Sequence, residues 1–141
     1  MNFPRSAIPF LAASAVALVA GCGEPSAQQQ VKDLVNSYIQ DYANHDGNSV
    51  CSKMTPANQQ RIQAAAGMLR GKDCAATMTT ISKLATGTQA AQARNTRAGK
   101  IVIDGNEAGV VLVPSAPGTK PTRIVKLDGK WLIDGSVSLA G

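Results

Sequence analysis

The sequence predicts an α+β fold, in which N-terminal helices pack on one face of a curved antiparallel sheet of about four strands. Two observations support this class. Apolar residues recur at helical spacing up to about residue 84, and β-branched or alternating runs follow from about residue 96. Turn sequences separate the later runs, which is typical of strands joined by hairpins. Helices that precede antiparallel strands in this way indicate an α+β domain.

The first helix is expected to carry one continuous apolar face. Its apolar residues are spaced i, i+3, i+4, i+7, i+8 and i+11, and they are Val31, Leu34, Val35, Tyr38, Ile39 and Tyr42. Polar residues take the other side, so the helix is amphipathic and packs on an apolar surface. We expect Gly47 to end it.

Shorter helices are expected after this one. Thr55 and Pro56 suit an N-cap and a first helical position, and Asp73 suits a second N-cap. The helix after Asp73 carries Cys74, Met78, Ile81 and Leu84 on one face. We place these helices at about 48–53, 56–66 and 74–87.

Four strands complete the predicted domain. Asp104-Gly105 and Asp128-Gly129 are tight-turn sequences, so they predict two hairpins. A proline-rich stretch from Pro114 to Pro121 makes the longer connection between these hairpins. The expected strands cover 96–103, 109–113, 122–127 and 130–134.

Residues 1–21 have the features of an export signal. Arg5 precedes a run of 14 uncharged residues, 7–20. A helix of that length, at about 1.5 Å per residue, is too short to cross a hydrocarbon core of about 30 Å. The segment Val19-Ala20-Gly21-Cys22 resembles the lipobox of a bacterial lipoprotein. The alternative is an ordinary secretory signal with a chance cysteine.

The lipobox resemblance implies an anchored protein. It implies cleavage before Cys22 and a diacylglycerol on the Cys22 sulfur, so that lipid holds the chain on the extracytoplasmic face of the cell membrane. Residues 22–30 then form the lipidated cysteine and a flexible tether, since they contain Gly and Pro and no aliphatic residue larger than alanine. The folded domain would be 31–141.

Cys51 and Cys74 are expected to form a structural disulfide. Export places them where disulfides persist, and lipidation of Cys22 leaves an even pair. Redox pairs usually have a Cys-x-x-Cys spacing, and a zinc site needs further ligands, whereas the chain has one histidine. The bridge would strengthen a light core, because only Tyr38, Tyr42 and Trp131 are aromatic beyond the signal.

Over residues 28–138 the chain resembles the nuclear transport factor 2-like (SnoaL-like) superfamily, and in particular its small actinobacterial lipoproteins. The features that carry the resemblance are the Tyr38/Tyr42 helix followed by Asn44-His45-Asp46-Gly47, the Cys51 and Cys74 pair around Met54-Thr55-Pro56, and the closing run Leu127–Asp134. The resemblance implies a cone with a pocket between helices and sheet. Enzymes of the superfamily hold an acid or base in that pocket.

Two functions follow as hypotheses. The first is a non-enzymatic binding module, because the segment from Cys51 to Asn58, where many members carry carboxylates, has none. The second is a pocket isomerase, dehydratase or hydrolase that uses Tyr38, Tyr42 and Asp134 on a small apolar substrate. The competing interpretations are core tyrosines with hydroxyls at the rim and a hydrogen-bonding role for Asp134, and Trp131 is expected to anchor the core.

Partners are limited by composition. The chain has no phosphate-binding loop or dinucleotide motif and one histidine, so we expect no cofactor and no metal site. We expect no nucleic acid partner despite a net charge of +5, because lysines and arginines are scattered. Besides the membrane, the expected partners are an envelope protein, an anionic polymer, a small apolar ligand, or a second copy bound through the sheet. Basic residues of the sheet half could attract the polymer, namely Arg94, Arg97, Lys100, Lys120, Arg123, Lys126 and Lys130, although a solvated basic face is equally consistent.

Overall fold

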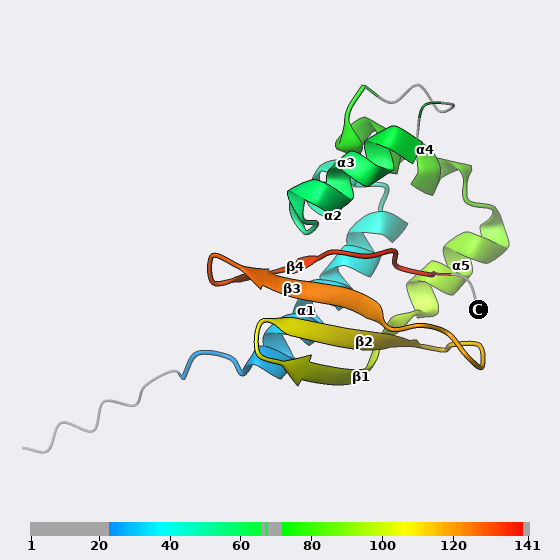
Figure 1. Ribbon diagram of the computed structural model, residues 1–141. Coiled ribbons are helices and arrows are strands. Elements are labelled where there is room, and N and C mark those ends of the chain that lie inside the picture. The colour runs from blue at the N-terminus through cyan, green and yellow to red at the C-terminus, as the bar shows by residue number, and fades with distance from the viewer. Residues whose placement is uncertain (1–22, 66, 68–71, 140–141) are drawn as a thin grey trace, which may run out of the picture.

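The computed structural model describes residues 23–65, 67 and 72–139. These residues form five helices followed by a four-stranded antiparallel sheet (Figure 1), so the α+β class is confirmed. The expected signal, 1–21, and the expected lipidation site, Cys22, lie outside the described residues.

Helix α1 spans Ala27–Ala43 and begins four residues earlier than predicted. The Ser26 hydroxyl caps it by accepting a hydrogen bond from the Gln29 backbone N–H at 3.2 Å. Residues 27–30, which we expected in the flexible tether, therefore form its first turn. Their run of alanine and glutamine carries no large apolar residue, and the helical pattern was visible only from Val31 onward.

Gly47 does not end α1. The helix ends at Ala43, and the chain reverses at His45, which has a φ of 60° and donates its backbone N–H to the Tyr42 carbonyl at 3.1 Å. Gly47 instead opens helix α2, Gly47–Ser52, after the N-cap Asp46. Hydrogen bonds from Ser49 lower the pKa of the Asp46 carboxyl.

The remaining helices are α3, Pro56–Ala65, α4, Cys74–Leu84, and α5, Gly87–Asn95. Both predicted N-caps are confirmed, because Thr55 Oγ1 accepts from Asn58 N at 3.1 Å and Asp73 Oδ1 accepts from Ala76 N at 2.8 Å. Helix α4 ends at Leu84 rather than near Gly87, and α5 was not predicted.

The sheet is a simple meander in the order β1-β2-β3-β4. The strands are β1, Arg97–Asp104, β2, Glu107–Val113, β3, Thr122–Leu127, and β4, Lys130–Ile133. Both predicted hairpins are confirmed, with positive φ at Gly105, Asp128 and Gly129. A short parallel bridge pairs Met54 with Ile133 and brings the start of α3 to the free edge of β4.

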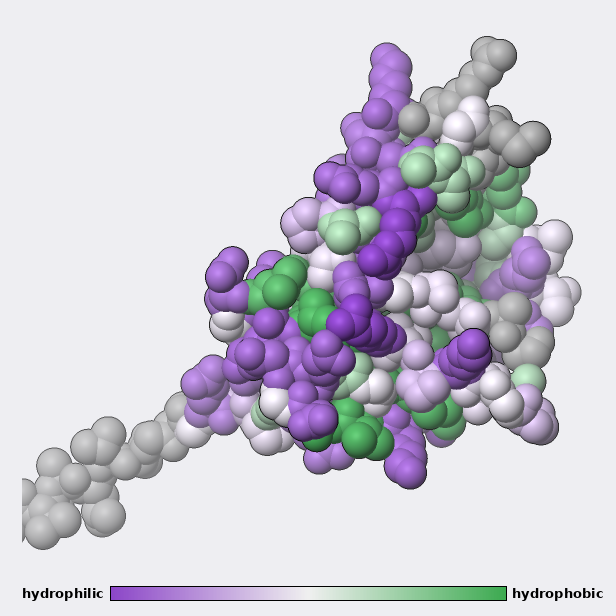
Figure 2. Space-filling view, viewed as in Figure 1, coloured by the Kyte–Doolittle hydropathy of each residue, from purple (hydrophilic) through white to green (hydrophobic). Residues whose placement is uncertain are grey.

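The core lies between α1 and the inward face of the sheet, where α1 crosses behind the strands in Figure 1. Trp131, on β4, is 5% exposed and belongs to this core, as predicted. On the outward face, Val102 is 57% exposed and Leu127 is 44% exposed. Figure 2 shows apolar side chains there interleaved with polar ones.

Candidate functional site

A cavity with a mainly apolar lining lies between α1, α4, the start of α5 and the segment after β4. Its volume is about 430 Å³. We call it the tyrosine cleft, and its lining residues include Tyr38, Tyr42, Ile81, Leu84, Gln89 and Leu139. Leu84, at the end of α4, is 65% exposed and stands at the rim. Figure 2 shows apolar side chains gathered beside α4.

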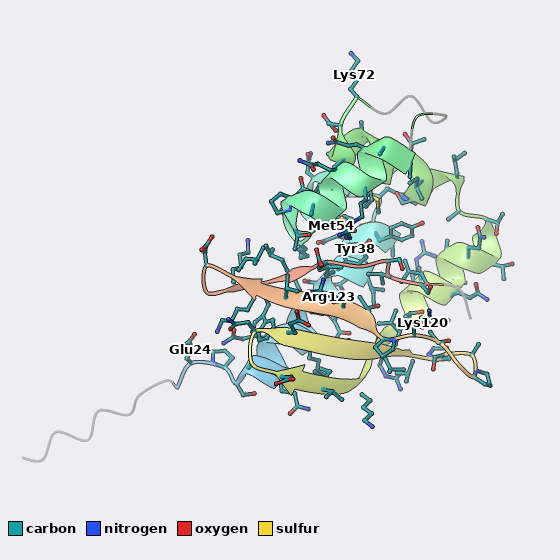
Figure 3. The ribbon with its side chains drawn as sticks, in the orientation of Figure 1. Glu24, Tyr38, Met54, Lys72, Lys120 and Arg123 are labelled. Carbon is teal, nitrogen blue, oxygen red and sulfur yellow. A yellow bond between two sulfur atoms is a disulfide. The ribbon has the colours of Figure 1, made fainter. Side chains whose placement is uncertain are left out.

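The two tyrosines come from one face of α1, since they are four residues apart. Tyr38 is 4% exposed and points into the interior (Figure 3), whereas Tyr42 is half-buried. Burial, with a smaller contribution from Tyr42, raises the pKa of Tyr38 far above its usual value, and burial also raises the pKa of Tyr42. Both phenols therefore stay protonated at neutral pH and are able to donate hydrogen bonds.

Asp134 is not brought to the tyrosines. It follows β4 and lines a different cavity, together with Thr55 and Arg123. Its Oδ1 accepts from Thr55 Oγ1 at 2.7 Å, and its Oδ2 accepts from Arg123 Nη1 at 2.5 Å. Both carboxylate oxygens are thus engaged in holding the start of α3 and β3 at the end of β4, which is the hydrogen-bonding role considered above.

The predicted disulfide is confirmed. Cys51 and Cys74 are bonded, and their Cα atoms lie 6.1 Å apart. The bridge joins α2 to the first residue of α4, the helix that carries Ile81 and Leu84 into the tyrosine cleft. It therefore fixes one wall of the site as well as the core.

Part of the cleft was missed by the sequence reasoning. Gln89 comes from the unpredicted helix α5, and Leu139 comes from the segment after the last strand. A signal was present for each. Thr86 and Gln89 form a capping box, and Val137 and Leu139 alternate with serines as in a strand.

The described residues hold no cluster of three or more His, Cys, Asp or Glu side chains that could bind a metal ion. None of the helices in the described part of the chain has the length and apolar character needed to cross a bilayer. Comparison of the chain with protein-family models, with curated proteins and with solved structures gives no match.

The buried tyrosine predicts an alkaline transition. Tyr38 has a raised pKa in the folded chain and a value near 10 when unfolded. Its contribution to stability is therefore fully present below pH about 10 and is lost as the pH rises above that value, because the unfolded chain ionises first. We expect urea unfolding to show a falling stability above pH about 10, and tyrosinate absorbance to show Tyr42 ionising before Tyr38. The variant Tyr38→Phe should lose most of this pH dependence. Simultaneous ionisation of both tyrosines at the ordinary value would contradict the prediction.

Proposed function

We propose that this protein is a lipid-anchored, extracytoplasmic binding module, and that its tyrosine cleft takes a small, mostly apolar molecule. The observation that carries the proposal is the composition of the cleft. Aliphatic side chains and two protonated phenols line it, and no charged residue is among its lining residues in the described part of the chain.

The size and shape of the cleft support this ligand class. Ligand pockets are typically about 300–1,000 Å³, mainly apolar, with a few polar groups that orient the ligand. The cleft volume of about 430 Å³ falls within that range. Tyr42 and Gln89 supply hydrogen bonds at the wall, so the preferred ligand has an apolar body and one or two acceptor atoms.

Binding is favoured over catalysis because the catalytic alternative needs an acid or base beside the tyrosines. Asp134, the carboxylate proposed for that role, is held by Thr55 and Arg123 in the other cavity. Burial also keeps Tyr38 protonated, which suits hydrogen-bond donation and opposes its use as a base at neutral pH.

The order of the elements supports a nuclear transport factor 2-like domain as part of the proposal. Helices come first, and α1 packs across a four-stranded antiparallel meander. The disulfide supports an extracytoplasmic location, where such bonds persist. Homodimerisation through the outward sheet face stays a prediction.

A matched pair of leucine variants tests the cleft. In the chain from Gly23 onward, we expect Leu84→Asp to weaken binding of the neutral fluorophore N-phenyl-1-naphthylamine by about tenfold. The substitution removes apolar contact and places a charge that the ligand would have to desolvate. Leu127→Asp makes the same chemical change at an exposed leucine of the outward sheet face and should leave the affinity unchanged. Equal affinities for the two variants, measured by fluorescence titration, would count against the tyrosine cleft.

The lipid anchor has a separate test. We expect Cys22→Ala to move the protein from the membrane fraction to the soluble fraction, because no acyl chain can then be joined to the thiol. Fractionation of cells that produce each form measures this. A variant retained in the membrane as fully as the parent chain would contradict lipidation at Cys22.

A further inference from the structure

A second groove lies on the other side of α1 from the tyrosines, between α1, α5 and the start of β1. Its volume is about 430 Å³. We call it the arginine groove, and the lining residues that matter are Asn36, Gln40, Asn44, Arg94 and Arg97. Figure 1 shows α5 leading into the end of the sheet where β1 begins.

The two arginines of this groove are available to a ligand. The described residues form three ion pairs, and neither Arg94 nor Arg97 takes part in one. By contrast, Arg123 is engaged by Glu107 and Asp134. Both groove arginines are exposed, and no carboxylate is found among the described residues that line the groove.

Of the two acids of α1, Asp41, next to Gln40 in the sequence, is paired with Lys53, and Asp33 accepts a hydrogen bond from the Gln29 side chain. A guanidinium group binds phosphate or carboxylate through two parallel hydrogen bonds. The pair is therefore suited to an oxyanion.

Three amide side chains line the same groove as the arginines. Asn36 and Gln40 lie one turn apart on α1, and Asn44, the C-cap residue, follows four residues later, so the three amides form one stripe that ends at the helix C-terminus. The Asn36 Oδ1 accepts from the Ala98 backbone N–H at 2.8 Å, which fixes the amide and leaves its NH₂ group as a donor. An amide side chain both donates and accepts hydrogen bonds, so it can pair with a sugar hydroxyl group, which also does both. Ile39 and Ala93, both buried, lie beneath the groove and make its floor apolar.

We propose that the arginine groove binds an anionic carbohydrate unit, with its phosphate or carboxylate on Arg94 and Arg97 and its hydroxyls on the amide stripe. This site is independent of the tyrosine cleft. The proposal places the binding of the expected anionic partner in one groove rather than on the whole basic face of the sheet half.

The full chain, isotope-labelled and held in a nonionic detergent, provides the test. We expect glucose 6-phosphate to shift the NMR signals of the Nε–H groups of both arginines and of the Asn36 and Gln40 amides in a saturable way. Inorganic phosphate should shift the arginine signals alone and bind more weakly, and glucose should shift neither set. Glucose 6-phosphate shifts that map away from the groove, or that do not saturate, would overturn the proposal.

Two sets of variants separate specific binding from general charge. The double variant Arg94→Gln/Arg97→Gln should lose at least about tenfold in affinity for glucose 6-phosphate. The control Lys72→Gln/Lys130→Gln changes net charge equally, and Figure 3 shows Lys72 at the end of the molecule beyond α3 and α4. Both control lysines are exposed. An equal loss of affinity in the two double variants would contradict binding in the arginine groove.

A third variant decides the matter if the arginine double variant fails to fold. Gln40→Ala removes one hydroxyl-binding amide and no charge. We expect it to weaken glucose 6-phosphate binding while leaving phosphate binding unchanged. If Gln40→Ala leaves the binding of glucose 6-phosphate as strong as in the parent chain, the carbohydrate assignment is overturned. The neutral probe of the tyrosine cleft does not sense these changes, so failure here leaves the proposed function standing.

Discussion

Removal of the disulfide by Cys51→Ala/Cys74→Ala is expected to lower the free energy of unfolding by about 3 kcal/mol or more. The two cysteines are 23 residues apart. Closing a loop of that length restricts the unfolded chain by about 3 kcal/mol in the chain-entropy treatment. Both residues are also buried, so the alanines leave unfilled space between α2 and α4 and add to the loss.

Urea denaturation followed by the fluorescence of Trp131, the single tryptophan, measures this change. Alanine is chosen over serine because a buried serine hydroxyl without a partner would add its own cost. The parent chain in reducing agent is the control, and it should lose about 3 kcal/mol, because reduction breaks the bridge but leaves both buried thiols in place. A loss below about 1 kcal/mol would contradict a structural role for the bridge.

The second large effect is expected at Gly47→Ala. A Cβ atom there would lie 2.0 Å from the Ala75 carbonyl oxygen and 2.4 Å from Thr79 Oγ1. The first contact is with backbone, so α2 and α4, which pack against each other, must separate. We expect a loss of at least about 3 kcal/mol, because a forced shift in a packed contact adds to the lost hydrogen bond from Gly47 N to Thr79 Oγ1.

Gly87→Ala is the matched control for Gly47→Ala. Gly87 is also the first residue of a helix, it is exposed, and a Cβ there meets nothing within 4 Å. We expect this variant to gain up to about 1 kcal/mol, because alanine loses less backbone entropy on folding. Thermal or urea unfolding compares the two. Similar effects of both substitutions would show that close packing at Gly47 is not the cause.

The disulfide removal and Gly47→Ala both act at the contact between α2 and α4. Gly47 and Cys51 both face α4, and residues that share a contact do not contribute independently to stability. We therefore expect the cost of Gly47→Ala to differ between the oxidised and reduced chain.

Much of the fold could be predicted because it depends on near neighbours. The N-caps at Thr55 and Asp73 need one side chain and a backbone N–H three residues away, and Asp128-Gly129 adopts its turn without help from distant residues. Helix α5 escaped prediction because its sequence has no apolar face, and only Ala93 is fully buried against the rest of the molecule. The end of α1 was misplaced because His45 took the left-handed conformation that glycine usually takes.

The sequence by itself determined the α+β class, the two hairpins, the cysteine pair and the apolar position of the tyrosines, since each rests on local spacing or on a count. Only the tertiary structure decided which side chains share a cavity. In the folded chain Asp134 is paired with Arg123 and lies away from Tyr38, and the arginine groove is formed between α1 and α5. The physical reason is that ion pairs and cavities form between segments far apart in the chain. Which residues meet in an ion pair or a cavity depends on how α1 and the sheet pack together, and no local sequence pattern encodes that packing.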